Sequence, residues 1–253
     1  MNKAPVTIVI PARYESSRFP GKSLAQLAGK PLIQHVYEQA IRVPHVDQVI
    51  VATDDSRIQQ AVEQFGGVAQ MVTAPCRTGT DRVAVVSRSL SSEVIVNLQA
   101  DEIFLNPDIL NDLIDPFLAD PALMGTLKRQ IEHQDEFLHP SVVKVVTDQE
   151  GMALYFSRAS IPHTRDQEDK GQTAPFASIH LGVYIFKRTT LLQFAELPTG
   201  KLEEAEKLEQ LRALEHGIPI KVWETKQPSL RIDTPEDLAE ANRSWERLMV
   251  EAR

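Results

Sequence analysis

A loop rich in cations follows the first apolar run of the sequence. Residues 6–10 are apolar, and Arg13, Arg18 and Lys22 follow them with Glu15 as the one acid in between. Guanidinium and ammonium groups form strong charge-assisted hydrogen bonds to phosphate oxygens. The pattern therefore favours a polyphosphate site. The alternative is a basic loop that is only solvated.

The loop is not one of the two most familiar phosphate-binding motifs. No G-x-G-x-x-G pattern follows Ile10, which excludes the Rossmann fingerprint. Residues 20–23 resemble the end of a Walker A motif, but Ser16 occupies the position of its first glycine. A helix is also not expected to begin directly at Ser23, so a cradle of helix N-terminal amides would be missing. We expect a phosphate site that relies on side-chain cations.

Two carboxylates are candidates for a magnesium site. Asp101 comes shortly after the apolar residues 94–98, and Asp233 lies beyond a predicted strand at 218–224. Magnesium prefers oxygen ligands and commonly shares them between protein carboxylates and substrate phosphates. The two acids could therefore bind one ion. The alternatives are a turn-forming role for Asp101 and a helix N-cap role for Asp233.

Further polar residues are weaker candidates when each is taken alone. Residues 77–82 offer hydroxyls and guanidinium groups that suit a base edge or a phosphate. Arg158, just past a predicted strand, suits a carboxylate or a surface ion pair. His180 and Tyr184 share one face of a predicted strand, where a lone histidine is more often structural. The Glu209-Gln210 pair lies on a predicted helix, where such pairs are usually solvated.

The elements that must position these residues alternate between strands and helices. Strands are predicted at 6–10, 48–52, 68–72 and 94–98, and helices at 31–41, at 80–90 and around Ile58–Phe65. This alternation predicts a parallel sheet with helices on both faces. Ligands of such sheets bind beyond the carboxyl ends of the strands. We therefore expect residues 13–22, 78–82 and 99–102 to lie along one crevice.

The pattern changes near residue 124. Strands are predicted at 124–131, 142–147, 153–156 and 180–186 with little helix between them. We interpret residues 123–187 as a mostly antiparallel lobe inserted into a nucleotide-binding α/β domain of residues 1–122 and 188–253. Residues 164–173 are expected to form a mobile loop. A helix at 202–216 ending at Gly217, a strand at 218–224 and a helix beginning at Thr234-Pro235 complete the domain.

Composition narrows the class of protein. The chain has 253 residues, 42% of them hydrophobic and 25% charged, as is typical of a soluble globular protein. A net charge of −8 argues against a general nucleic-acid binder. The single cysteine, Cys76, excludes an internal disulfide and a cysteine-based zinc cluster. No apolar run suits a secretory signal or a membrane span, so we expect a cytoplasmic protein without membrane insertion.

Eight segments spread over nearly the whole chain resemble the 3-deoxy-manno-octulosonate (Kdo) cytidylyltransferases, also called CMP-Kdo synthetases. The segments are residues 11–22, 52–55, 78–82, 96–102, 153–162, 180–184, 208–212 and 233–237. The resemblance implies a GT-A-like α/β nucleotidyltransferase fold. It also implies an enzyme that couples CTP to an eight-carbon acid sugar for lipopolysaccharide biosynthesis, with Mg²⁺ as cofactor, and a homodimer that forms through the lobe. The chain departs from the family pattern at Ala100, Ile103, His163 and Arg231.

The same resemblance implies a role for each candidate residue. Ala12, Arg13 and Lys22 would bind the nucleotide, and Arg13 and Lys22 would hold its triphosphate and, with Asp101, act in catalysis. The remaining implied sites are Arg77, Thr78, Gly79, Thr80 and Arg82 for the nucleotide, Asp101 and Asp233 for magnesium, and Gln99, Arg158, His180, Tyr184, Glu209 and Gln210 for the sugar.

The implied reaction is an in-line attack of the sugar's anomeric hydroxyl on the α-phosphate of CTP, which releases pyrophosphate. Magnesium would lower the pKa of the hydroxyl, and no dedicated protein base is evident. Three alternatives remain: a cytidylyltransferase for a related acid sugar such as 8-amino-Kdo or a sialic acid, a sugar-transferring enzyme of the same fold, and a non-catalytic nucleotide-binding regulator. The presence of both acids argues against the regulator.

Overall fold

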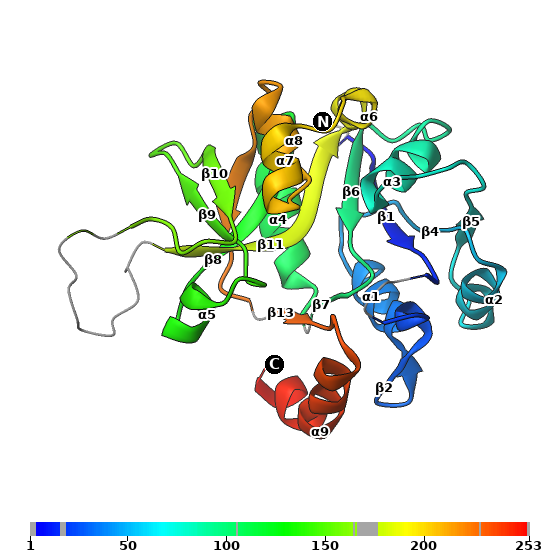
Figure 1. Cartoon of the computed structure of the whole chain (residues 1–253). Helices are drawn as coiled ribbons and strands as arrows, with labels where there is room; N and C mark the ends of the chain where they lie inside the picture. Colours follow the sequence, from blue (N-terminus) through cyan, green and yellow to red (C-terminus); the bar gives the residue numbers. More distant parts are fainter. Residues whose placement is uncertain are drawn as a thin grey trace.

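Nine strands of the described part of the chain form a mixed sheet at the centre of the computed structural model (Figure 1). The structure describes residues 4–15, 19–104, 106–163, 165, 177–227 and 229–251. Arg18 and all of the expected loop at 164–173 except Arg165 lie outside these residues. Among the described residues, no helix combines the length and the hydrophobicity that crossing a membrane requires.

Four parallel strands form one half of the sheet, in the order β5, β4, β1, β6. They span Val6–Ala12 for β1, Gln48–Thr53 for β4, Ala69–Met71 for β5 and Val94–Leu98 for β6. Every residue of β1 and β6 is buried, as expected for central strands covered on both faces. The strands predicted from the apolar runs are thus confirmed, with shifts of one or two residues at their ends.

The other half of the sheet is mostly antiparallel. It contains β8 (Met124–Gln130), β9 (Lys144–Thr147), β10 (Ala153–Ser157), β11 (Ser178–Lys187) and β12 (Lys221–Glu224). The long strand β11 pairs with β9 in its first half, with β6 in its second half and with β8 along both, while β12 runs parallel to β8. The antiparallel strands therefore continue the same sheet as the parallel ones. The division at residues 123 and 187 remains a prediction.

Helices cover both faces of the sheet. Ile8 and Ile10 of β1 belong to one apolar core, and Val9 between them belongs to a second core on the opposite face. The first core packs against α1 (Leu32–Ala40), α2 (Ser56–Gln64), α4 (Asp108–Ala119) and α9 (Pro235–Glu251); the second packs against α3 (Gly79–Ser87), α6 (Arg188–Glu196) and α8 (Gln210–Glu215). This layering confirms the predicted fold class, a mainly parallel sheet with flanking helices and added antiparallel strands.

Several short elements complete the described chain. The loop after β1 leads into a 3-10 helix, η1 (Lys22–Leu24), and then a small hairpin of β2 (Gln26–Leu27) and β3 (Lys30–Pro31). A second small sheet pairs β7 (Glu102–Phe104) with β13 (Ser229–Arg231) in antiparallel fashion. Neither small sheet is predicted by the sequence patterns, and the β7–β13 ribbon proves important for the site.

One sequence prediction about a helix is wrong. Residues 202–216 do not form one helix, because α7 (Lys201–Glu206) ends at Lys207, whose φ of 54° is left-handed, before α8 begins. The Glu215 carboxylate of α8 then accepts hydrogen bonds from the first turn of α7, which fixes the two helices side by side. The lobe contains a short helix, α5 (Gln134–Leu138), which agrees with the little helix predicted there.

Candidate active site

Lys22 lies between the two predicted magnesium ligands. Its ammonium Nζ donates to Asp101 Oδ2 at 2.6 Å and lies 3.5 Å from Asp233 Oδ1. All three side chains are largely shielded from solvent, with exposed fractions of 13% for Lys22, 24% for Asp101 and 13% for Asp233. The three residues named from separate sequence segments therefore meet at one point.

The β7–β13 ribbon brings the two acids together. In its register Arg231 lies opposite Glu102, and the backbone N–H of Ile232 donates to the carbonyl of Asp101 at 3.2 Å. Asp101 therefore precedes one strand of the pair and Asp233 follows the other, at the same end of the ribbon. The pairing of β7 with β13, which are about 130 residues apart in the sequence, therefore places Asp101 and Asp233 next to each other.

The N-cap alternative for Asp233 does not fit the structure. The hydroxyl of Thr234 accepts the N–H of Asp237 at 3.1 Å, and the Asp237 carboxylate accepts the N–H groups of Asp233 and Thr234 at 2.9 Å each. This reciprocal arrangement at the start of α9 is a capping box with Thr234 as its N-cap. Asp237 thus satisfies the helix end, and the Asp233 side chain faces Lys22 and Arg231 instead.

The turn at residues 78–80 forms hydrogen bonds with Glu209, which precedes α8. Thr78 caps α3 by accepting the N–H of Asp81, and its hydroxyl donates to Glu209 at 2.7 Å. The Thr80 hydroxyl donates to the other Glu209 oxygen at 2.5 Å, and burial raises the pKa of Glu209. Glu209, predicted as a sugar ligand, therefore buttresses the predicted nucleotide turn in this structure.

The hydrogen-bond network continues to Gln99. The Asn97 amide donates to the Thr80 hydroxyl at 2.9 Å, and the Gln99 amide donates to Asn97 at 2.8 Å. A Cβ atom added at Gly79 would lie 3.2 Å from Pro11 and 3.3 Å from Gln99, so glycine permits the close approach of turn and strand ends. Residues at the ends of β1, β6 and the start of α3 are thus locked together, as the crevice prediction requires.

A polar hollow of about 390 Å³ lies beside this turn. Its walls include Arg13, Thr78, Arg82 and Cys76. Arg82 is nearly fully buried and forms an ion pair with Asp54, another wall residue. Arg77 lies outside the walls and pairs with Asp81 at 3.2 Å. Arg13 and Arg82 therefore share this hollow, whereas Arg77 and Lys22 do not line it.

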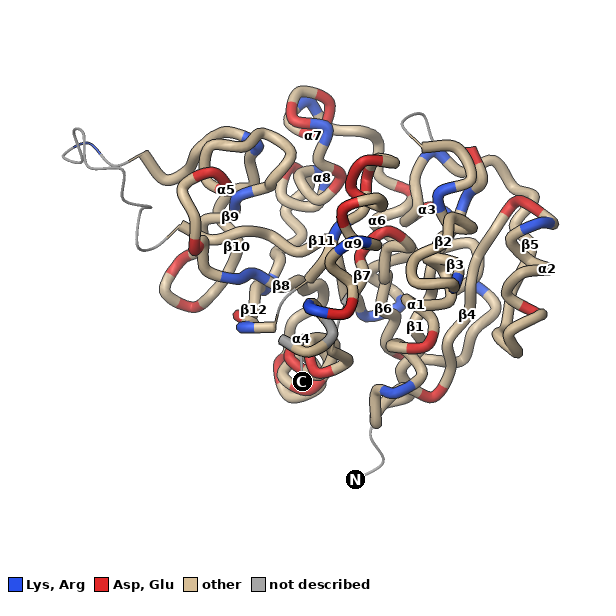
Figure 2. The backbone as a smooth tube through the Cα atoms, turned by 90° about the horizontal axis from the view of Figure 1, so that it is seen from below, with Lys and Arg blue, Asp and Glu red and all other residues tan. Residues whose placement is uncertain are grey.

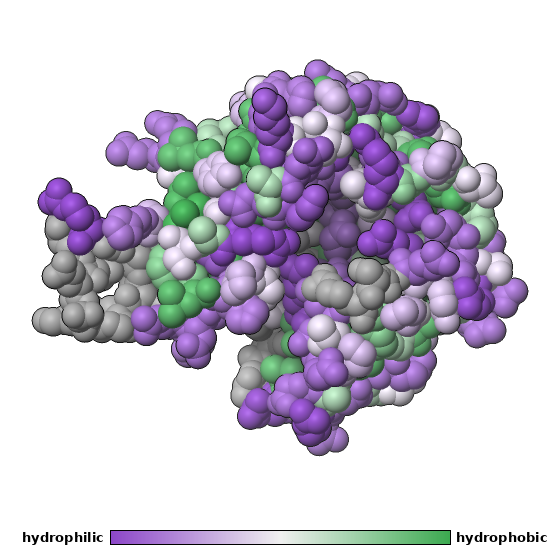
Figure 3. Space-filling model, viewed as in Figure 1, coloured by the Kyte–Doolittle hydropathy of each residue, from purple (hydrophilic) through white to green (hydrophobic). Residues whose placement is uncertain are grey.

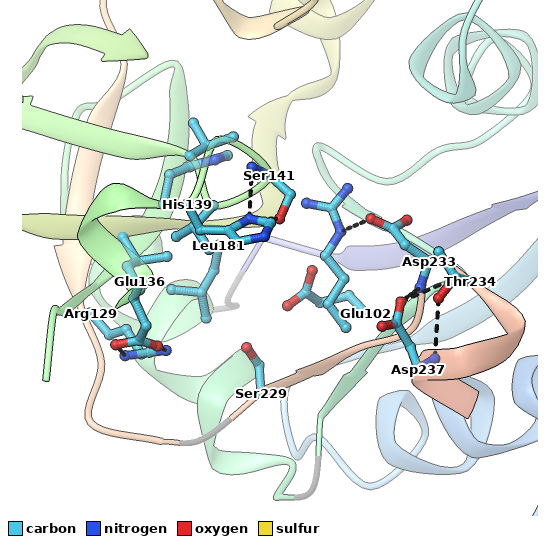
Figure 4. A pocket seen from close by; sticks show the side chains of 15 residues that line it. Glu102, Arg129, Glu136, His139, Ser141, Leu181, Ser229, Asp233, Thr234 and Asp237 are labelled. Atoms are coloured by element: carbon cyan, nitrogen blue, oxygen red, sulfur yellow. Dashed lines mark hydrogen bonds and ion pairs between the residues drawn. The ribbon is translucent and has the colours of Figure 1, made fainter. Parts of the chain in front are cut away.

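A second pocket, of about 400 Å³, opens between the ribbon and the lobe (Figure 4). Glu102, Asp233 and Asp237 lie toward one side, and the Arg129–Glu136 ion pair lies toward the other. Its size falls within the range of small-ligand sites. Figure 3 shows a hollow in the middle of the molecule whose visible walls are largely hydrophilic.

His180 and Tyr184 lie next to each other on β11. Their ring centroids are 5.3 Å apart, and the His180 ring also forms a hydrogen bond of 3.0 Å with the Thr126 hydroxyl. Burial, with a smaller contribution from the Arg231 charge, lowers the pKa of His180 to about 3. Burial also raises the pKa of Tyr184 well above 10. Both side chains are therefore neutral near pH 7, and His180 lines the second pocket.

Two predicted sugar ligands have other surroundings. Arg158 donates from Nε to the Glu206 carbonyl at 2.8 Å and from Nη1 to the Pro140 carbonyl at 3.2 Å, so it links the lobe to α7. Gln210 is buried at the first position of α8. Neither residue lines the second pocket. The structure thus places Gln99 and Glu209 at the turn of residues 78–80. His180 and Asp233 line the second pocket. Arg158 and Gln210 do not line it.

Several pocket residues were missed from the sequence. Glu102 is almost fully buried, and desolvation raises its pKa to about 7 despite the opposing charge of Arg231. The position of Glu102 next to Asp101 could have indicated that it belongs to the site. The departure from the family pattern at Arg231 could have indicated the same for that residue. Arg129, Glu136 and His139 gave no signal, because the unpredicted helix α5 carries or adjoins the last two.

Comparisons with known proteins support one family. A family model described as cytidylyltransferase matches residues 7–224. The 3-deoxy-manno-octulosonate cytidylyltransferase of Trichlorobacter lovleyi is 52% identical over 243 residues, which cover 93% of this chain and 96% of that protein. The chain belongs to this cytidylyltransferase family. The corresponding protein of Geobacter sulfurreducens is 50% identical over 240 residues, with coverages of 92% and 96%.

Solved structures agree with this assignment. A CMP:2-keto-3-deoxy-manno-octonic acid synthetase complexed with CTP matches with a TM-score of 0.89 and 40% identity, covering 96% of this chain and 99% of that one. A 4-diphosphocytidyl-2C-methyl-D-erythritol synthase from Anaerococcus prevotii has a TM-score of 0.62 at 14% identity and covers 97% and 100%. The second likeness shows the shared fold alone. The family membership makes this chain a nucleotidyltransferase.

Proposed function

We propose that this cytidylyltransferase couples CTP to 3-deoxy-manno-octulosonate and releases pyrophosphate. The relatives at about 50% identity carry this name, and the structural neighbour at 40% identity binds CTP. The observation that carries the proposal is the convergence of Lys22, Asp101 and Asp233, of which Asp233 also lines the second pocket. A nucleotide on one side and a sugar on the other would place their reacting atoms near these three residues.

The nucleotide would occupy the side that faces Arg13, Arg82 and the turn at 78–80. Arg13 is exposed at the end of β1, where its guanidinium can reach phosphate oxygens, and Lys22 supplies a second cation nearby. The Thr78 and Thr80 hydroxyls are already fixed by Glu209, so the turn meets a ligand with little rearrangement. These cations would stabilise the negative charge that develops on the departing pyrophosphate.

Asp101 and Asp233 fit a magnesium ion. Both carboxylates face one point, where the Lys22 ammonium lies, so an ion beside that ammonium would have oxygen ligands from both acids. In the described part of the chain, no cluster of three or more His, Cys, Asp or Glu side chains that could hold a metal is found. Two carboxylates completed by phosphate oxygens and water are a normal ligand set for Mg²⁺. When bound, the ion would stabilise charge on the α-phosphate and lower the pKa of the attacking hydroxyl.

The residues around the second pocket would orient the sugar. His180 and Tyr184 are held neutral and fixed by packing, so they suit hydrogen bonds to hydroxyl groups. The anomeric hydroxyl would have to lie on the side of Asp101 and Asp233, in line with the bond from the α-phosphate to the leaving group. No described residue is assigned as a protein base for this step.

The test is pyrophosphate release from CTP and Mg²⁺ with a panel of sugars. The panel contains 3-deoxy-manno-octulosonate, its 8-amino analogue, a sialic acid and a control without sugar. We expect release that depends on 3-deoxy-manno-octulosonate. Release only with another acid sugar would keep the reaction class and refute the substrate. CTP binding without release for any of these sugars would refute the proposed reaction.

A further inference from the structure

Arg231 lines the second pocket and has N–H donors available for a ligand. It lies on β13 opposite Glu102, its side chain is 47% exposed, and it lines the second pocket. Its Nε lies 3.2 Å from Asp233 Oδ2. Within the described part of the chain, no hydrogen bond from its two terminal nitrogens is found. The edge of the guanidinium that forms bidentate contacts is therefore open to a ligand.

The other charges of the pocket are already engaged. On the far side of the pocket, Arg129 donates from both terminal nitrogens to the carboxylate of Glu136. Its guanidinium is therefore occupied by a partner within the protein. Asp237 accepts two backbone N–H groups at the start of α9. His180 is neutral because burial lowers the pKa of its ring to about 3. Arg231 is thus the lining cation best placed to meet an incoming anion.

The position of Arg231 matches the place where a sugar is needed. It belongs to the same ribbon as Asp233, so an anion held by Arg231 lies beside the acids that face Lys22. Its charge also acts on the neighbouring His180 and Tyr184 of β11. A pocket that already contains the carboxylates of Glu136, Asp233 and Asp237 would repel another carboxylate unless a guanidinium compensated the charge.

We propose that Arg231 binds the carboxylate of the acid sugar through its two terminal nitrogens and so selects acid sugars over uncharged ones. The proposal rests on the proposed function, because it assigns a ligand group within the same site. A planar guanidinium matches a carboxylate in a paired, parallel geometry that an ammonium cannot reproduce. Selection follows because a neutral sugar in this position would leave the guanidinium without its partner.

The experiment compares two substrates in two proteins. Wild type and Arg231→Gln are each assayed for pyrophosphate release with 3-deoxy-manno-octulosonate and with its C1 carboxamide, which keeps the anomeric hydroxyl and lacks the charge. For Arg231→Gln we expect the KM for the acid to rise by about 10- to 100-fold, with an unchanged KM for CTP. The KM for the carboxamide should differ by less than about twofold between the two proteins. Arg231→Lys should fall between them, because it keeps the charge and loses the fork.

Two further measurements separate the rival explanations. Arg129→Gln is the matched variant, since it removes the other guanidinium of the pocket. An acid-specific loss in Arg129→Gln but not in Arg231→Gln would overturn the proposal. The proposal would also be overturned if Arg231→Gln left the ratio of the KM values for acid and carboxamide unchanged and shifted the Mg²⁺ concentration needed for half-maximal rate. Arg231 would then act by positioning Asp233. Absence of turnover by wild type with any acid sugar would instead refute the proposed function, and the proposal about Arg231 with it.

Discussion

Asp101 and Asp233 are close enough to share one cation, and this makes their removal informative. We expect Asp101→Asn and Asp233→Asn each to lower pyrophosphate release by about 100- to 1000-fold, because one oxygen ligand and one negative charge are lost. The measurement is initial rate against Mg²⁺ concentration. Asp108→Asn, an exposed acid in the first turn of α4, is the matched control. Full activity of Asp101→Asn at saturating Mg²⁺ would show that the metal site lies elsewhere.

His180 gives the protein a pH-dependent stability. Its pKa in the folded chain is lowered to about 3, whereas an unfolded histidine titrates near 6.5. Between these values the unfolded chain binds a proton that the folded chain does not, so stability falls as pH decreases through 6.5. We expect this histidine to account for about 2 kcal/mol of the loss between pH 7 and pH 5.

The measurement is urea denaturation of wild type and His180→Asn at several pH values. The stability of the variant should fall less steeply between pH 7 and pH 5, even if the variant is less stable at pH 7. His163→Asn changes an exposed histidine and is the matched control. Equal slopes for wild type and His180→Asn would contradict the buried, neutral state of His180.

Individual residues were predictable where they adjoin a strong local pattern. Lys22, Asp101 and Thr78 follow apolar runs or precede helices, so their place at the carboxyl ends of parallel strands follows from the topology. The contact of Glu209 with Thr78 and Thr80 was not predictable, because it joins helix ends about 130 residues apart. No local signal encodes such tertiary contacts.

The β7–β13 ribbon is the element that holds the two acids together. Ile232 anchors it, since this side chain is fully buried in the first core and its N–H bonds to Asp101. We expect Ile232→Ala to lower the free energy of unfolding by about 2–4 kcal/mol and to raise the Mg²⁺ concentration needed for half-maximal rate. Ile232→Val should cost about 1 kcal/mol and leave the magnesium requirement near that of wild type.

Urea denaturation and rate measurements on the same samples test this prediction. If Ile232→Ala is destabilised while its magnesium requirement stays at the wild-type value, the ribbon is not what positions the acids.

The break between α7 and α8 depends on Lys207 in a left-handed conformation. Left-handed φ values strain residues that carry a Cβ, and glycine avoids this strain. We expect Lys207→Gly to be neutral or to stabilise the protein by up to about 1 kcal/mol, and Lys207→Val to destabilise it by about 1 kcal/mol. Thermal unfolding of both variants provides the check. A clear loss of stability in Lys207→Gly would contradict the conformational explanation.

At the level of elements, the sequence patterns located long periodic segments well and short ones poorly. Strands β1, β4 and β6 were evident because continuous apolar runs mark central parallel strands. The strands of the ribbon have three residues each, too few for a period to show. Helix α8 was merged with α7 because the helical apolar pattern continues across Lys207, and only the backbone dihedral reveals the break.

The whole molecule should respond to its nucleotide as one unit. CTP with Mg²⁺ at about 100 times its Kd should add about 2.7 kcal/mol of stability, since the ligand binds only the folded chain. For a chain of this size we expect the Tm to rise by about 5–10 °C. Differential scanning calorimetry with CTP alone, Mg²⁺ alone and both together tests this. Equal Tm values for all samples would argue against a nucleotide site.

Charged residues are distributed over the entire chain, with acidic and basic positions interspersed (Figure 2). This distribution accompanies the overall net charge of −8. The homodimer and the cytoplasmic location expected from the sequence remain predictions. The mass in solution, compared with the 28.3 kDa of one chain, is the direct test of the dimer.

The ribbon also has a consequence for how the protein is made. A chain growing on the ribosome exposes the cationic loop, the turn at 78–80 and Asp101 long before Asp233 has been synthesised. Until β13 exists and pairs with β7, Asp101 can pair with Lys22 but lacks the second acid, Asp233. The order of synthesis thus delays the meeting of the two proposed magnesium ligands until β13 has been synthesised, and we expect chains that end before β13 not to release pyrophosphate from CTP.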